Sequence, residues 1–242
     1  MEVAGISIEV LRKNNKNMHL YVLPPDGKVR VSAPYKVDDE AIRLFVLTKI
    51  GWVKSKIRDF EYQPRQTARE YVSGESHYLW GNRYRLKLEE GANRNSVITR
   101  AGYIVLSVRE GSDLSDRERI MNEWYRKALK DRIPEMIERW QERIGVTVIE
   151  WQVKNMRTKW GTCNVSEKRV WFSLQLAKKP VECLDYIVVH ELCHLLQNDH
   201  SAEFAALMDK HLPNWRETQK LLNGFIMDAY DGRFDGNCED EE

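Results

Sequence analysis

Residues 184–200 read LDYIVVHELCHLLQNDH, a largely apolar run with two histidines and a glutamate at close spacing and a third histidine at its end. The apolar positions predict a buried helix, and Pro180 is suited to its first turn. His190 and His194 are four residues apart, so an α-helix places both imidazoles on nearly the same face. Glu191 follows the first histidine. The stretch therefore predicts a helix that directs two imidazoles and a neighbouring carboxylate toward one point.

A third metal ligand is expected after this helix. His200 lies six residues beyond His194, where a continuous helix would turn it about 120° away. Asn198 and Asp199 favour a break in the helix and Ser201 can cap the next one, so His200 can return to the other two histidines. The competing third ligands are Asp199, Glu203 and Asp209.

Three imidazole ligands fit Zn²⁺ best, with Co²⁺, Ni²⁺ or Mn²⁺ as substitutes in vitro. Three protein ligands and one open position are typical of catalytic zinc rather than structural zinc. Glu191 is then the expected general base, which takes a proton from the metal-bound water as that water attacks a carbonyl or phosphoryl centre. The sequence predicts a zinc-dependent hydrolase.

The composition is that of a folded globular protein, with 42% hydrophobic and 31% charged residues in 242. A net charge of +1 gives no overall attraction to nucleic acid or to anionic membranes. No stretch approaches the roughly 18 to 20 apolar residues of a membrane-spanning helix, and the N-terminus lacks the features of a secretory signal. We expect a cytoplasmic protein without a membrane partner. Reduced thiols are expected for Cys163, Cys183, Cys193 and Cys238.

The residue pattern predicts an α+β protein. Residues 1–112 are expected to form a β-rich N-terminal region, with a small antiparallel sheet, later hairpins and one helix from about Asp38 to Phe60. Residues 113–234 are expected to form the catalytic domain, and the acids of residues 235–242 suggest a solvated tail.

Within the catalytic domain, a long helix is predicted over Asp113 to Arg143, with Pro134 inside it. Strands are predicted over Val146 to Val153 and Arg169 to Leu174. Two helices are predicted after the metal ligands, over Ala202 to His211 and Trp215 to Met227.

Residues 156–164, MRTKWGTCN, extend the metal motif upstream. The combination resembles the YgjP-like metallopeptidase family, in which R-x-x-W-G-S/T-C precedes HELCH and a third histidine, and the match runs from about Val146 to Leu222. This resemblance implies a zincin-like catalytic domain of helices and strands, related to the WLM and SprT-like peptidases, that acts on a protein or peptide substrate. It also implies zinc ligands at His190, His194 and His200 and a catalytic Glu191.

The Trp160-Gly161-Thr162-Cys163 segment has two interpretations. It is a tight turn in which Gly161 gives backbone freedom while Trp160 and Cys163 pack in the core, or it is one wall of the substrate cleft. In the second case Trp160 and Arg157 are substrate-binding residues, although Arg157 is equally explained as a surface arginine. Residues 170–174 are expected to form either an edge strand to which a peptide can add or an ordinary core strand.

Two other functions compete with a peptidase. The first is hydrolysis of a nucleotide phosphoanhydride, because the resemblance family has been linked to nucleotide pyrophosphatase activity, but no phosphate-cradling Gly-rich loop is present. The second is a nucleic-acid-associated protein with a structural zinc, since basic and aromatic residues are interleaved before the metal helix. These residues are Trp151, Lys154, Arg157, Lys159, Trp160, Lys168, Arg169, Trp171 and Phe172.

Overall fold

The computed structural model describes residues 1–23, 27–62, 69–156 and 159–224. Contacts divide the chain between residues 68 and 69 into two compact units. Both units combine helices with strands, which confirms the predicted α+β class. Within the described ranges, no helix is long and apolar enough to cross a membrane.

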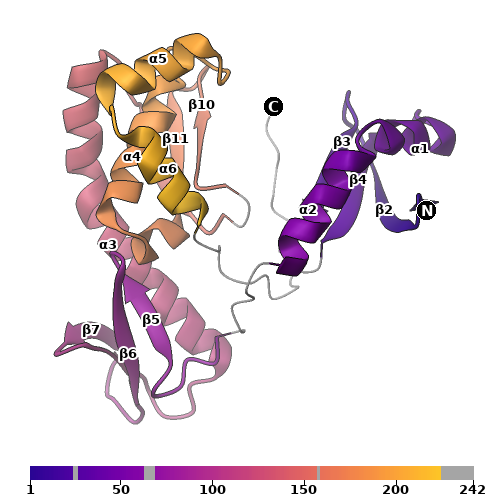
Figure 1. Ribbon diagram of the computed structural model, residues 1–242. Coiled ribbons are helices and arrows are strands. Elements are labelled where there is room, and N and C mark those ends of the chain that lie inside the picture. The colour runs from indigo at the N-terminus through magenta and orange to yellow at the C-terminus, as the bar shows by residue number, and fades with distance from the viewer. Residues whose placement is uncertain (24–26, 63–68, 157–158, 225–242) are drawn as a thin grey trace. The chain divides into compact units, whose positions relative to one another are not determined.

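The first unit is a four-stranded sheet followed by two helices (Figure 1). The strand order is β1-β2-β4-β3, and β4 pairs antiparallel with β3 but parallel with β2. The sheet is therefore mixed, not antiparallel as predicted, because β4 inserts between the two strands that precede it. The strands are β1 (Glu2–Val3), β2 (Ile6–Lys13), β3 (His19–Leu23) and β4 (Lys28–Pro34).

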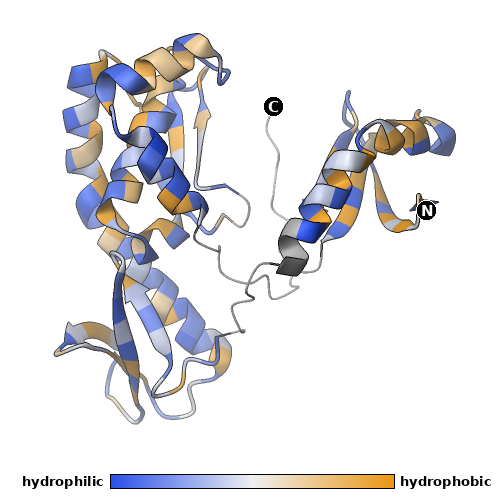
Figure 2. Ribbon diagram, viewed as in Figure 1, coloured by the Kyte–Doolittle hydropathy of each residue, from blue (hydrophilic) through white to orange (hydrophobic). Residues whose placement is uncertain are grey.

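The predicted single helix of this unit is two helices, α1 (Asp39–Thr48) and α2 (Ile50–Tyr62). They separate at Lys49, whose φ of -113° and ψ of 11° leave the helical region. Hydrophilic and hydrophobic residues alternate along these helices and the strands before them, as expected for elements with one buried face (Figure 2). The core of this unit consists of Val3, Ile8, Val29, Val31, Ala33, Ile42, Val46 and Val53.

The second unit begins with a sheet of the same topology, in the order β5-β6-β8-β7, with β6 and β8 parallel. Two of the predicted hairpins are confirmed: Gly81 turns the chain between β5 and β6, and Gly102 between β7 and β8, with φ of 80° and 81° that favour glycine. The strands are β5 (Ser76–Leu79), β6 (Asn82–Glu89), β7 (Ser96–Arg100) and β8 (Tyr103–Ser107).

The long helix α3 (Leu114–Ile144) confirms the predicted helix, including Pro134 within it. The Asp113 carboxylate caps its first turn, and Gly145 ends it in the left-handed region with φ of 82°. Leu86 and Leu106 of the sheet share one core with residues of α3. The predicted domain boundary between residues 112 and 113 therefore falls inside the second unit.

A three-stranded sheet follows α3, in the order β10-β11-β9. Its strands are β9 (Glu150–Lys154), β10 (Gly161–Asn164) and β11 (Arg169–Ser173). The sequence analysis missed β10, because a four-residue strand starting at Gly161 gives little alternating pattern. Of the two interpretations of residues 170–174, the core strand is confirmed, since β11 is central and β10 is an edge.

The described chain ends with four helical elements, of which α4, α5 and α6 are labelled in Figure 1. His190 lies in α4, and His194 and His200 lie between α4 and α5. The helix α4 packs against α3, α5, α6 and strand β10. Both α5 and the start of α6 agree with the predicted helices, although residues 225–227 of the second lie outside the described ranges. The elements are the 3₁₀ helix η1 (Leu174–Lys178), α4 (Val181–Cys193), α5 (Ala202–His211) and α6 (Trp215–Asn223).

The cysteines of the described chain are free, as predicted. Cys183 and Cys193 are buried in the core, and Cys163 is partly buried. Cys238, the acidic tail and Arg157 lie outside the described residues.

Asp185 joins α4 to α3 by accepting hydrogen bonds from the Trp140 indole N–H at 2.7 Å and from the Arg139 guanidinium. Asp185→Ala would leave the buried indole N–H without an acceptor, so we expect the free energy of unfolding to fall by about 1 to 3 kcal/mol in urea denaturation. Asp131→Ala is the matched control, because that carboxylate makes an exposed pair with Lys127 on one helix. Equal losses in the two variants would contradict a structural role for Asp185.

Candidate metal centre

His190 and His194 lie one turn apart at the end of α4 and direct their imidazoles toward one point. The Nε2 atom of His194 lies 3.1 Å from the Nε2 atom of His190. The Nε2 atom of His200 lies 3.0 Å from the Nε2 atom of His190. The three histidines thus form a group able to hold one metal ion.

His200 reaches this point because α4 ends earlier than predicted. The break was expected at residues 198–199, but the last helical residue is Cys193. The Gln197 main-chain N–H donates to the Cys193 carbonyl at 3.0 Å, which closes a turn, and the chain bends at residues 198 and 199 before His200. The Ser201 hydroxyl then caps α5, as predicted. A short loop between two helices therefore supplies the third imidazole.

The imidazoles are held by contacts on their other sides. The Nδ1 atom of His194 lies 3.1 Å from the Gln197 carbonyl oxygen, which favours a proton on Nδ1 and leaves Nε2 as the donor atom for a metal. The Phe204 ring packs against all three imidazoles, with centroid distances of 5.0 Å to His190, 4.6 Å to His194 and 4.9 Å to His200. Phe204 is a site residue that the sequence analysis missed.

The environment keeps His190 and His194 neutral. Burial, followed by the nearby His194 and His200, lowers the pKa of His190 to about 3. Burial also lowers the pKa of His194, although the hydrogen bond to the Gln197 carbonyl acts in the opposite direction. Neutral imidazole is the form that binds a metal.

The geometry of the donor atoms fits zinc. Imidazole nitrogens that bind one zinc tetrahedrally at about 2.0 to 2.1 Å are about 3.3 Å apart, close to the separations of 3.0 and 3.1 Å in this group. The Nδ1 atom of His190 is buried and has no hydrogen-bond partner in the described part of the chain. Clustering three imidazoles in this way, with His190 and His194 partly buried, is costly without a shared ligand.

The competing carboxylates have other partners. Asp209 accepts hydrogen bonds from the Trp215 indole at 2.8 Å and from Arg216. Asp199 accepts from the Gln197 amide, and Glu203 is exposed on the first turn of α5. Only the three histidines emerge as a metal-binding group in the described ranges, and no carboxylate joins them.

Comparison with known families agrees with this geometry. A model of the YgjP-like metallopeptidase domain matches residues 16–225. This chain belongs to the YgjP-like metallopeptidase family. Its membership makes it a metal-dependent peptidase and implies a protein or peptide substrate.

Two solved structures show a partial similarity. The metallopeptidase zymogen of Pyrococcus abyssi abylysin is 15% identical, with a TM-score of 0.36, over 40% of this chain and 99% of that chain. The metallopeptidase zymogen of Methanocaldococcus jannaschii jannalysin is 19% identical, with a TM-score of 0.35, over 39% of this chain and 97% of that chain. A comparison with curated proteins gives no match.

Glu191 of this YgjP-like chain lies next to the histidines and is 4% exposed. Burial raises the pKa of its carboxyl group to about 8, while the Lys159 ammonium acts in the opposite direction. A bound cation would also lower this pKa. Glu191 lines the same cavity as the three histidines.

This cavity has a volume of about 420 Å³ and contains the predicted Trp160 in its wall. Trp160 and Cys163 line this cavity and also pack against the core, so substrate binding by Trp160 remains a prediction. Arg157 lies outside the described residues. The opposite wall, from α4 and α6, was missed by the sequence analysis because its residues show no motif. It includes Tyr186, Ile187, Gln219, Leu222 and Asn223.

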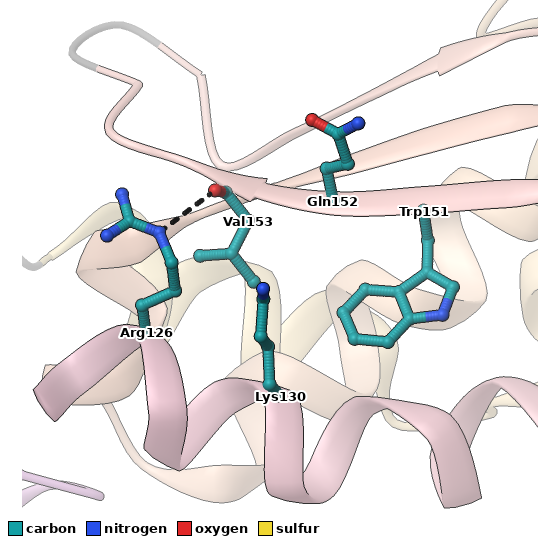
Figure 3. A pocket seen from close by; sticks show the side chains of 5 residues that line it. All are labelled: Arg126, Lys130, Trp151, Gln152 and Val153. Atoms are coloured by element: carbon teal, nitrogen blue, oxygen red, sulfur yellow. Dashed lines mark hydrogen bonds between the residues drawn. The ribbon is translucent and has the colours of Figure 1, made fainter. Parts of the chain in front are cut away.

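A second cavity, of about 630 Å³, lies between α3 and β9, away from the histidines (Figure 3). Arg126 and Lys130 point from α3 toward the strand, and the Arg126 Nε–H donates to the Val153 carbonyl at 3.5 Å (Figure 3). Cations beside a free strand edge protect it from pairing with other chains. We therefore interpret this cavity as part of the edge of the sheet.

The basic and aromatic residues proposed for nucleic acid do not share one surface. Phe172 is fully buried, and Trp160 lies in the wall of the metal cavity. Trp171 is covered by the Lys154 ammonium and the Arg169 guanidinium, which lie over its ring. This dispersal gives no support for a stacking surface among the described residues.

The geometry predicts that His200, and not Asp209, is the third ligand. We expect His200→Ala to lose most of its bound metal in elemental analysis, because only two donor atoms remain. Asp209→Ala is the control and should keep the metal content of the unmodified chain. The opposite result, with metal kept in His200→Ala and lost in Asp209→Ala, would move the third ligand to the carboxylate.

Proposed function

We propose that this metallopeptidase is a zinc enzyme in which His190, His194 and His200 hold the metal and Glu191 is the general base. The observation that carries this proposal is the meeting of three imidazole Nε2 atoms beside a buried carboxylate in one cavity. The family membership supports the reaction class. The imidazole donor set supports zinc over metals that prefer oxygen ligands.

Zinc in such a site lowers the pKa of water to about 7 and polarises a carbonyl group. The residues of this chain supply proton transfer and orientation. Glu191 takes the proton from the attacking water and returns it to the leaving amine. Burial favours the protonated form of Glu191, whereas the nearby Lys159 ammonium favours the ionised form. Both forms are therefore accessible during the reaction.

We propose that the substrate lies along β10. This strand is an edge of its sheet, and its residues Gly161, Thr162 and Cys163 line the metal cavity. An extended peptide can add to such an edge by main-chain hydrogen bonds, which bind a peptide without regard to its side chains. Tyr186 and Leu222 on the opposite wall then contact a substrate side chain.

Hydrolysis of a nucleotide phosphoanhydride is the alternative that an experiment should separate. A polyphosphate needs several cationic or main-chain donors. Apart from the histidines, Lys159 is the one cation among the described residues that line the cavity. The described wall therefore favours a peptide.

Glu191→Gln tests the proposed base. The amide keeps the size of the side chain but cannot accept a proton, so we expect casein or peptide cleavage to fall by about 10²- to 10⁴-fold while zinc remains bound. The same proteins are assayed for release of pyrophosphate from nucleoside triphosphates. Pyrophosphate release that exceeds peptide cleavage and depends on Glu191 would replace the peptidase proposal, and full peptidase activity in Glu191→Gln would remove Glu191 from its role.

A further inference from the structure

Gly161 is the point where β10 passes directly over the side chain of Glu191. The register of the sheet places Gly161 opposite Phe172 and Cys163 opposite Val170, and these two partners are fully buried. Gly161 and Cys163 therefore face the core and α4, while Thr162 faces the other side of the sheet. The inward positions of β10 carry the two smallest side chains of the strand.

A side chain at Gly161 would occupy the space of the Glu191 carboxylate. A Cβ atom added there would lie 2.8 Å from both Cγ and Cδ of Glu191, and closer still to Oε1. Cβ atoms essentially never approach other heavy atoms within 3.0 Å. The atoms that collide belong to a side chain and not to the backbone, so an alanine would displace the carboxylate before it displaced the strand.

The requirement for glycine here is one of space. The φ of Gly161 is not in the left-handed region, so the residue does not provide the backbone freedom of a tight turn. Gly81 differs, since its φ of 80° is one that side chains rarely adopt and its neighbour is Pro180. Of these two glycines, Gly161 is the one whose nearest neighbour is a proposed catalytic group.

We propose that Gly161 is a positioning residue that sets the place of the Glu191 carboxylate. The main chain of β10 contacts the buried side chain of Glu191 and so limits where its carboxylate can lie. The Trp-Gly-Thr-Cys segment is then tied to the reaction because its glycine leaves room for the base. This inference rests on the proposed role of Glu191 as general base.

Gly161→Ala should lower kcat with little change in KM, because substrate contacts along β10 use the main chain. A displacement of about 1 Å at a reacting group is on the scale that costs about 10²-fold, and we expect a loss of that order. Zinc content and melting temperature should stay close to those of the unmodified chain. Gly51→Ala is the matched control, since a Cβ atom there meets nothing within 4 Å. Gly161→Ala with unchanged kcat would overturn the proposal.

A double-mutant cycle with Glu191→Asp separates positioning from general damage. The shorter aspartate leaves room for the new methyl group, so the activity losses of Gly161→Ala and Glu191→Asp should be less than multiplicative, by about tenfold or more. If the two activity losses multiply, the proposed direct contact between residues 161 and 191 is contradicted. If Gly161→Ala does not fold, the double variant Gly161→Ala/Glu191→Ala should regain cooperative melting. If neither variant folds, the positioning role of Gly161 is also overturned.

Glu191→Gln is measured in the same assay to keep the two proposals apart. If Glu191→Gln is inactive and Gly161→Ala is fully active, the positioning role of Gly161 is overturned and the proposed function is left intact. A fully active Glu191→Gln overturns the proposed base, while the melting temperatures of the cycle still report whether residues 161 and 191 touch.

Discussion

The burial of polar groups on α4 is the constraint on which the rest of the second unit depends. The other faces of this helix carry apolar side chains that are fully buried, such as those of Leu184, Val188 and Leu192. Two imidazoles and a carboxylate in such surroundings are costly unless they stay neutral or share a ligand. Two neighbouring elements enclose these groups: α5 places Phe204 against the imidazoles, and β10 approaches Glu191 closely at Gly161.

The sequence predicted the parts of the site that depend on helical geometry. The spacing of His190 and His194 is sufficient to place both on one face, and the cap at Ser201 was recognisable from local chemistry. His200 was also correctly grouped with them, although the helix ends before the expected break. Interactions within about one turn of a helix are encoded locally, which is why these predictions succeeded.

The contacts that the sequence did not predict are those between distant segments. Strand β10 is recognised only through its pairing with β11, and Phe204 is an apolar residue that any amphipathic helix would contain. The same limit applies to the sheets before α3, where the positions of strands were predicted but parallel pairing was not. Each sheet places its last strand between two earlier ones, and nothing local in the chain specifies that insertion.

The short loop between α4 and α5 has a thermodynamic consequence. His200 belongs to neither helix, and it is held near the other imidazoles by the turn at Gln197 and by Phe204 one turn into α5. Any ion that gathers the three rings must also fix this loop, so binding energy is available to order the C-terminal helices. Binding of an ion therefore opposes local unfolding of α5, and local unfolding of α5 weakens binding of the ion.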